Sequence, residues 1–172
     1  MSSTRADSIC HHGIIGMKWG VRRYQNYDGT LTPRGEKRYG SVQEIHSKKT
    51  GEKLYMAERR HKKEDKDRNF DVLRNGEKVG NVWLEDQGSN LYLNWIDTKK
   101  TERGKGYADS VMDYLVVYAD KNDYKTMTLE VPKNSPDARH IYEKHGFKAQ
   151  PETKKQDEDD VWGGLTAMKR SR

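Results

Sequence analysis

The stretch Arg103-Gly-Lys-Gly-Tyr-Ala108 decides how the rest of the sequence is interpreted, because it lies between a segment with strand periodicity and one with helix periodicity. Two glycines one residue apart permit a tight turn and a close backbone approach. A turn that opens a helix presents backbone N–H groups to an anion. The same pattern also fits a charged surface loop, so the flanking segments have to distinguish the two interpretations.

Upstream of this stretch, the sequence predicts three antiparallel strands. Asn75-Gly76 is a strong two-residue hairpin signal between two apolar runs. Gly80, within the second strand, indicates a bulge or a close backbone approach. In residues 90–97 (NLYLNWID), Leu91, Leu93 and Trp95 alternate with Tyr92, Asn94 and Ile96. This period of two predicts a third strand.

Downstream, the sequence predicts two helices and further strands. The elements are a helix with apolar spacing from Tyr107 to Tyr118, a strand at 126–131, a helix between Ser135-Pro136 and Gly146, and a last strand within residues 161–170. This order predicts an α+β (mixed α/β) fold in which the helix-linked strands are adjacent and parallel.

Three separated segments, in this order, resemble the GNAT acetyltransferases. Arg103, Gly106 and Ala108 match the family signature R/Q-x-x-G-x-G/A between a strand and a helix. Residues 138–147 (ARHIYEKHGF) match a second signature, A-x-x-x-Y-E-K-x-G-F, and residues 163–171 (GGLTAMKRS) look like the family's last strand. The resemblance covers about residues 69–172.

The resemblance implies an N-acetyltransferase that takes its acetyl group from acetyl-CoA. It implies a GNAT-like central mixed sheet with antiparallel strands first and two helices packed on it. It also implies a V-shaped splay between strands 91–97 and 126–131, where the pantetheine arm inserts. The turn at 103–108 would then hold a pyrophosphate through its backbone N–H groups.

The resemblance also supplies the candidate donor-binding residues. Backbone groups around Ile96 to Thr98 would contact pantetheine and polarise the thioester carbonyl. Asn134 is carried over less directly, because the family often has Asn where this chain has Ser135. The residues expected to bind acetyl-CoA are Ile96, Thr98, Arg103, Gly104, Lys105, Gly106, Tyr107, Ala108, Asn134 and Tyr142.

Tyr142 and Asp97 are the candidate catalytic residues. Tyr142 stands where the family places the acid that protonates the leaving thiolate, although it also fits a core tyrosine with its hydroxyl at the edge. Strand 91–97 has no glutamate in its middle, where some members keep a general base. Asp97 and Glu85 are the candidate replacements for that general base, and a relay of water molecules that removes the proton is an equal alternative. Asp97 also fits a residue that only ends its strand.

The acceptor is expected to be a protein lysine. The family usually has two helices between its first and second strands, and residues 53–70 (KLYMAERRHKKEDKDRNF) are too short and too charged for that pair. An open acceptor groove suits a protein side chain better than a buried small molecule. The rival hypothesis is a non-catalytic phage structural or nucleic-acid-binding module on a degenerate GNAT fold.

The charge distribution divides the chain into parts. Residues 1–68 carry a net charge of +7 and residues 69–172 a net charge of −1. We therefore expect a basic, aromatic-containing arm at 1–40, a charged connector with a candidate first strand at 41–68, and the acetyltransferase domain at 69–172. Within the arm, Thr32-Pro33 predicts the start of a short helix.

Residues 10–40 are similar to a segment of phage and prophage structural (head-region) proteins of Gram-positive hosts. This resemblance suggests a phage or prophage protein that acts on a host factor in the host cytoplasm, or that associates with the phage particle. Aromatic side chains such as Trp19 and Tyr24 alternate with basic ones such as Arg22. The arm is expected to stack on nucleic acid, to anchor on a protein, or to be a solvated tail.

The remaining composition argues against membranes and metals. No apolar run approaches the ~18 residues of a membrane span, and residues 1–10 are too polar for a signal peptide. The one cysteine, Cys10, fits a reducing, cytoplasmic compartment. Cys10, His11 and His12 are adjacent and cannot comfortably bind one ion together, so we expect no metal site.

Overall fold

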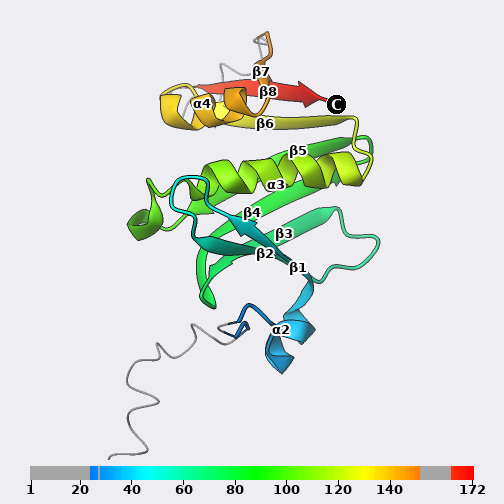
Figure 1. Cartoon of the computed structure of the whole chain (residues 1–172). Helices are drawn as coiled ribbons and strands as arrows, with labels where there is room; N and C mark the ends of the chain where they lie inside the picture. The colour runs from blue at the N-terminus through cyan, green and yellow to red at the C-terminus, as the bar shows by residue number, and fades with distance from the viewer. Residues whose placement is uncertain (1–23, 27, 152–163) are drawn as a thin grey trace, which may run out of the picture.

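The computed structural model describes residues 24–26, 28–151 and 164–172, and they form one eight-stranded sheet with helices (Figure 1). The strands follow the order β1-β2-β3-β4-β5-β6-β8-β7. They are β1 (Tyr39–His46), β2 (Lys53–Arg59), β3 (Asp67–Arg74), β4 (Glu77–Gln87), β5 (Asn90–Thr98), β6 (Thr126–Pro132), β7 (Lys148–Ala149) and β8 (Leu165–Ser171). The helices are α2 (Pro33–Arg38), the short 3₁₀ helix η1 (Lys100–Glu102), α3 (Tyr107–Lys121) and α4 (Pro136–Lys144). Strands β1 to β5 are antiparallel, β5 and β6 are parallel, and the others are antiparallel, which confirms the predicted mixed sheet.

The predicted hairpin connects β3 to β4. Asn75 and Gly76 both have positive φ, 50° and 76°, as a two-residue turn between twisted strands requires. Gly80 of β4 lies where the backbones approach closely, because a Cβ atom there would meet the carbonyl oxygen of Asp97 at 2.4 Å. The predictions for Asn75-Gly76 and Gly80 are therefore confirmed.

Helix α3 lies across one face of the sheet and closes the main core (Figure 1). The apolar positions of β2 to β6 meet its buried side, which includes Val111, Met112 and Leu115. On β3, the Phe70 ring packs edge-on against the Tyr114 and Tyr118 rings, with centroids 5.9 and 5.3 Å away. Burial of these rings provides much of the hydrophobic free energy that fixes α3 on the sheet.

Strands β5 and β6 separate part-way along their length. Their parallel pairing ends with Leu93 opposite Leu129, and beyond this point β5 pairs only with β4, and β6 only with β8. A register shift occurs in the β4–β5 ladder, where Trp83 pairs with Trp95 and Leu84 pairs with Leu93. Asn94 is therefore an extra residue on β5 without a partner on β4, as in a β-bulge. This is the V-shaped splay expected between strands 91–97 and 126–131.

Residues 41–68, expected to be a charged connector with a candidate first strand, lie for the most part in two strands of the sheet. Strands β1 and β2 pair along their whole length and are joined by the short turn at 47–52. Leu54 and Met56 point into the core, and the charged residues of the hairpin point outward. Only a few positions of each strand are buried, and most of the others carry charged side chains. The alternation of apolar and polar residues that marks a strand is therefore hard to recognise in this part of the sequence.

The second half of the expected arm also packs on the sheet. Tyr24 and Leu31 contact a small apolar cluster of Tyr39, Ala57 and Leu73. Helix α2 begins as predicted, since the Thr32 hydroxyl accepts a hydrogen bond from Gly35 N at 3.1 Å. The described residues between 24 and 38 therefore pack against their own chain. Residues 1–23 lie outside the described part.

A buried carboxylate ties this segment to the sheet. Asp71 of β3 contacts Arg59 at 2.7 Å, Lys78 at 3.0 Å and Arg38 at 3.4 Å, and accepts a hydrogen bond from the Tyr39 hydroxyl at 2.8 Å. Burial alone would raise the pKa of Asp71, but the bonds from Arg59, Lys78 and Tyr39 outweigh it and lower the pKa to about 2. The folded state therefore favours the charged carboxylate.

Asp71→Asn is expected to destabilise the protein in a pH-dependent way. A folded-state pKa of about 2, below the ordinary 3.8, contributes stability that is complete above about pH 4 and is lost as the pH falls toward 2. The shift corresponds to about 2 kcal/mol in the free energy of unfolding at pH 7. Urea unfolding at pH 7 and pH 3 measures it, with the exposed Asp123→Asn as control. An equal loss at both pH values would mean that the charge of Asp71 is not responsible.

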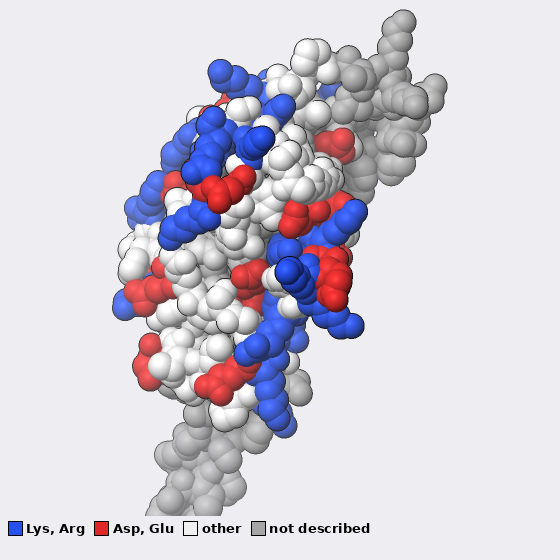
Figure 2. Space-filling view, turned by 90° about the vertical axis from the view of Figure 1, so that its right-hand side faces the viewer, with Lys and Arg blue, Asp and Glu red and all other residues white. Residues whose placement is uncertain are grey.

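The surface of the described residues carries both charge signs. On the side seen in Figure 2, Lys and Arg side chains lie beside Asp and Glu side chains over much of the surface. Pairs such as Arg170 with Asp120, at 3.1 Å, and Lys144 with Asp109, at 2.7 Å, hold opposite charges together. No described helix is long and apolar enough to cross a membrane.

Candidate active site

A cleft of about 720 Å³ opens where β5 and β6 separate. It is bounded by the end of β5, the loop that leads to α3, and the beginning of α4. The predicted residues that line it are Ile96, Asp97, Thr98, Arg103, Gly104, Gly106, Tyr107, Ala108, Asn134 and Tyr142. Three separated sequence segments thus meet in one cleft, and Lys105 alone among the predicted residues is not part of its lining.

The loop before α3 has its peptide groups oriented by the β1–β2 turn. Ser47 Oγ donates to the carbonyl of Lys105 at 2.7 Å, and Lys49 Nζ donates to the carbonyl of Gly104 at 2.5 Å. In a trans peptide the C=O and the following N–H point in opposite directions. The N–H groups of Lys105 and Gly106 therefore point away from the turn, and none of the described residues accepts a hydrogen bond from them.

These N–H groups continue into the first turn of α3, whose own N–H groups have no partner within the helix. Gly106 caps that helix in the left-handed region, with φ of 76°, and Gly104 has φ of 78°. A Cβ atom at Gly106 would lie 2.9 Å from the Cβ of Lys49. The loop is therefore a set of oriented donors at a helix N-terminus, which suits a phosphate or pyrophosphate.

Ser47 and Lys49 were not among the residues predicted from the sequence. Both belong to the segment expected to be a charged connector with a candidate first strand, and they are far from the loop in the chain. Ser47 is buried, and Lys49 lines the cleft. The available signal was the run Ser47-Lys48-Lys49-Thr50-Gly51, a small polar residue with lysines at a turn, and that pattern is common on protein surfaces.

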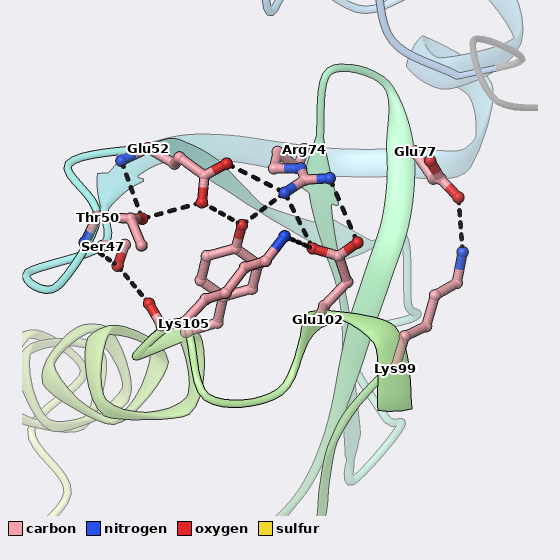
Figure 3. Close-up of polar contacts among 9 residues, drawn as sticks. Ser47, Thr50, Glu52, Arg74, Glu77, Lys99, Glu102 and Lys105 are labelled. Carbon is pink, nitrogen blue, oxygen red and sulfur yellow. Dashed lines mark hydrogen bonds and ion pairs between the residues drawn. The ribbon is translucent and has the colours of Figure 1, made fainter.

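A polar network fixes both ends of the loop (Figure 3). The Tyr107 hydroxyl donates to Glu52 at 2.6 Å and accepts from Arg74 at 2.8 Å. Arg74 also pairs with Glu102 at 2.9 Å, and Glu102 with Lys105 at 2.8 Å. Burial, and then the hydrogen bond with Glu52, raises the pKa of Tyr107 to about 12. The side chains of Tyr107 and Lys105 thus belong to a supporting network, and their backbone groups remain for a ligand.

The side chain of Arg103 folds back onto the end of β5. Its Nε donates to the carbonyl of Thr98 at 3.1 Å, and its Nη2 lies 3.3 Å from Asp97 Oδ1. Asp97 is therefore an ion-paired carboxylate within the cleft lining.

Tyr142 of α4 has a buried ring and lines the cleft. It is 9% exposed and packs edge-on against Phe147, with the ring centroids 6.1 Å apart. None of the described residues forms a hydrogen bond with its hydroxyl. Burial raises the pKa of Tyr142, so the hydroxyl keeps its proton at neutral pH. The ring fits a core tyrosine and its place in the cleft lining fits a proton donor, so the structure is compatible with both sequence interpretations.

Among the described residues, no group of three or more His, Cys, Asp and Glu side chains is arranged to hold a metal ion. The sequence Cys10-His11-His12 lies outside this part of the chain.

Comparison with known families identifies the fold and its chemistry. Residues 38–147 match the model of the Acetyltransferase (GNAT) family, which is more than half of the chain. The chain belongs to the GNAT acetyltransferase family. It is a GNAT-type N-acetyltransferase, and its acetyl donor is acetyl-CoA. The match includes β1 and β2, the hairpin within the expected connector.

Solved structures with the same fold agree with this family. A spermidine N-acetyltransferase chimera that includes the Vibrio cholerae enzyme is 20% identical, with a TM-score of 0.57, over 63% of this chain and 68% of that one. The ribosomal-protein-S18-alanine N-acetyltransferase from Escherichia coli is 19% identical, with a TM-score of 0.55, over 62% and 69% of the two chains. A Bacillus subtilis acetyltransferase in complex with CoA is 14% identical, with a TM-score of 0.53, over 62% and 78%. At these identities the likeness establishes the fold only. A search of curated protein sequences finds no match.

The N-terminal segment has a match of its own. Residues 2–26 match the model of a family of unknown function (DUF7211). This match assigns no role to the segment, so its resemblance to phage structural proteins remains a prediction.

Ser47→Ala is expected to weaken acetyl-CoA binding. The Ser47 hydroxyl donates to the Lys105 carbonyl and accepts from the backbone N–H groups of Lys49 and Thr50, at 3.3 and 3.2 Å. Loss of this anchor should cost about 1 kcal/mol of binding free energy, a roughly fivefold higher Kd. Calorimetric titration of acetyl-CoA measures it, with Ser41→Ala as control, because Ser41 is exposed and its hydroxyl bonds to Glu58 instead. An equal Kd for the two variants would contradict a role of Ser47 in orienting the loop.

Proposed function

We propose that this enzyme transfers the acetyl group of acetyl-CoA to the side-chain amine of a protein lysine. The observation that carries the proposal is the position of the cleft at the splay, together with the short β1–β2 connection. The connection at 47–52 contains no helix, so the chain lacks between these two strands the helix pair that usually shapes the acceptor site in this family. An acceptor site without that pair suits a side chain that is carried by another protein.

The residues around the cleft fit acetyl-CoA. The N–H groups of Lys105 and Gly106, with those of the first turn of α3, suit the pyrophosphate. Beyond Leu93 and Leu129 the two strands no longer pair with each other, which leaves backbone groups around Ile96 to Thr98 for the pantetheine amides. A 720 Å³ cleft has room for an extended ligand of this size. We assign Asn134, at the start of α4, to the edge of this binding site.

When bound, acetyl-CoA supplies an acetyl group activated as a thioester. A C–N bond forms to the lysine amine and the C–S bond breaks, so one proton leaves the amine and one is needed at the sulfur. We assign the proton donation to the Tyr142 hydroxyl, whose raised pKa keeps it protonated. We assign the proton acceptance to the Asp97 carboxylate, directly or through a water molecule. Arg103 holds that carboxylate in position.

The acceptor class is tested with the full-length protein, acetyl-CoA and two panels of amines. One panel contains lysine peptides, and the other contains small amines, spermidine among them. We expect acetylation of lysine side chains in peptides, detected by mass spectrometry, at rates well above those for free amines. Efficient acetylation of small amines with no transfer to peptides would contradict a protein acceptor.

We infer that residues 1–40 localise the enzyme and do not take part in the chemistry. The segment has a basic and aromatic composition, and its resemblance to phage structural proteins suggests a phage or prophage protein that reaches a particle component, a nucleic acid or a host factor in the cytoplasm. In this proposal residues 69–172, with the hairpin in residues 41–68, form the catalytic unit. Titration of duplex DNA at low and high salt checks the nucleic-acid option, since phosphate contacts weaken with salt. Binding that salt does not change would contradict it.

A further inference from the structure

The sheet face opposite α3 carries two exposed tryptophans beside the splay. Trp83 of β4 is 42% exposed and Trp95 of β5 is 57% exposed. They are opposite each other in the β4–β5 ladder. Val82 and Leu84, on either side of Trp83, point into the core under α3, so Trp83 and its partner project from the other face. Exposed tryptophans of this size are uncommon on a surface with no binding role.

Carboxylates without a cationic partner lie next to this pair. Tyr92 of β5 is opposite Glu85 in the β4–β5 ladder, and the carboxylate of Glu130 on β6 is close enough to act on its hydroxyl electrostatically. Neither Glu85 nor Glu130 forms an ion pair with another described residue. Burial, and then the charge of Glu130, raises the pKa of Tyr92, which is the response of a phenol close to an uncompensated negative charge.

The position of Glu130 connects this surface to the reaction cleft. The last parallel pair of β5 and β6 is Leu93 with Leu129, so Glu130 is the first residue of β6 beyond the pairing. On β5 the first residue beyond the pairing is Asn94, the extra residue of the register shift, and Trp95 follows it. One arm of the splay therefore carries an exposed aromatic ring and the other an exposed carboxylate, on the face away from α3. A chain that crosses this face passes directly over the opening between the strands.

The charge of this face changes away from the splay. Trp83 Nε1 donates to Asp67 at 2.8 Å. Asp67 also lines a hollow of about 420 Å³, where it and Asp65 lie among the basic side chains of Arg59, Arg60 and Lys66. A positively charged ligand is therefore favoured at Glu85 and Glu130 over this hollow, whose carboxylates have cationic neighbours.

We propose that this surface, made of Trp83, Trp95, Tyr92, Glu85 and Glu130 and called here the Trp95 face, docks a basic peptide segment around the acceptor lysine. The inference deepens the proposed function and rests on it, because it names the sequence context of the lysine. Cationic side chains next to the acceptor lysine stack on the exposed indole rings and meet the carboxylates of Glu85 and Glu130. The lysine between them reaches into the splay toward Asp97 and Tyr142.

The test uses full-length protein and three peptides of equal length, each with one lysine and with arginine, serine or glutamate at the flanking positions. We expect kcat/KM for the arginine-flanked peptide to exceed that for the glutamate-flanked peptide by about 10- to 100-fold. The double variant Glu85→Gln/Glu130→Gln should bring this ratio to within about threefold. Both substitutions are at surface positions and keep the side-chain shape, so the fold is retained.

Aromatic stacking is tested separately with Trp95→Ala. It should raise the KM of the arginine-flanked peptide about tenfold. Val117→Ala is the matched control, because Val117 is also an exposed apolar residue but lies on α3, which covers the other face. Calorimetric titration of each peptide in the presence of CoA provides a readout that needs no turnover, and the same differences are expected in Kd.

The outcomes separate this inference from the proposed function. Two outcomes would overturn the role of the Trp95 face and leave lysine acetylation intact. In the first, the enzyme acetylates lysine peptides at rates that do not depend on the flanking charge. In the second, the rates depend on that charge, but the double variant does not change this dependence. Binding of the arginine-flanked peptide that the double variant abolishes, without any transfer, would support the surface and contradict lysine as the acceptor. Absence of both binding and transfer, or a dimer in sedimentation that Trp95→Ala dissolves, would overturn the inference.

Discussion

Tyr142→Phe is expected to lower kcat for acetyl transfer by about 100-fold or more, the usual contribution of a positioned general acid. The substitution removes one hydroxyl group from a ring that is otherwise held by packing against Phe147. Because the ring stays in place, the Kd for acetyl-CoA should remain within about threefold of the parent value, which is less than 1 kcal/mol. Single-turnover kinetics and calorimetric titration measure the two quantities on the same preparation.

The matched control is Tyr114→Phe. Tyr114 is a half-buried tyrosine of α3 that packs edge-on against Phe70 and does not line the cleft. It should change kcat by no more than about twofold, within the range of a surface substitution. A kcat for Tyr142→Phe that equals the control would identify Tyr142 as a packing residue, and water would then protonate the leaving sulfur.

Gly106→Glu is expected to raise the Kd for acetyl-CoA by at least about 100-fold, nearly 3 kcal/mol. Three effects act together. The position has φ of 76°, which costs a side chain roughly 1 kcal/mol or more of strain. The new Cβ lies 2.9 Å from the Cβ of Lys49 and must displace the β1–β2 turn. The added carboxylate also repels the phosphates of the ligand.

Gly88→Glu separates the site-specific effects from strain. Gly88, in the β4–β5 turn, has φ of 78°, and a Cβ there meets no atom within 4 Å. It receives the same charge in nearly the same backbone conformation, away from the cleft lining. The control should bind acetyl-CoA as the parent does. If both variants lose binding equally, or if neither loses it, the loop before α3 is not the phosphate site.

Local signals in the sequence were sufficient for much of the fold. Asn75-Gly76 specifies its turn because few residues accept two successive positive φ values. The glycines at 104 and 106 likewise mark a conformation that a side chain would strain. These signals depend only on the backbone conformation of one short segment. They can therefore be recognised in the sequence without knowledge of the contacts that the segment makes with the rest of the chain.

Contacts between distant segments were not predictable in the same way. Ser47 and Lys49 meet the loop before α3 only because β1 and β2 join the sheet, and their own sequence resembles an exposed turn. Lys105 was among the residues expected to bind acetyl-CoA, but its side chain pairs with Glu102 in the partly buried cluster around Arg74 and does not line the cleft. Which way a charged side chain turns depends on partners that the linear sequence does not identify.

The contact between the β1–β2 turn and the loop before α3 bears on where the catalytic unit can be cut. A fragment that starts at residue 69 retains all the family signature residues, from Arg103 to Phe147. It lacks Ser47, Lys49 and Glu52, which hold the donor loop from outside. It also exposes an open edge on β3, where β2 had paired along Tyr55 to Glu58. Expression boundaries for this enzyme therefore belong upstream of Tyr24, whose side chain packs on the sheet, and we expect a trimmed domain chosen by its motifs alone to aggregate through the uncovered strand.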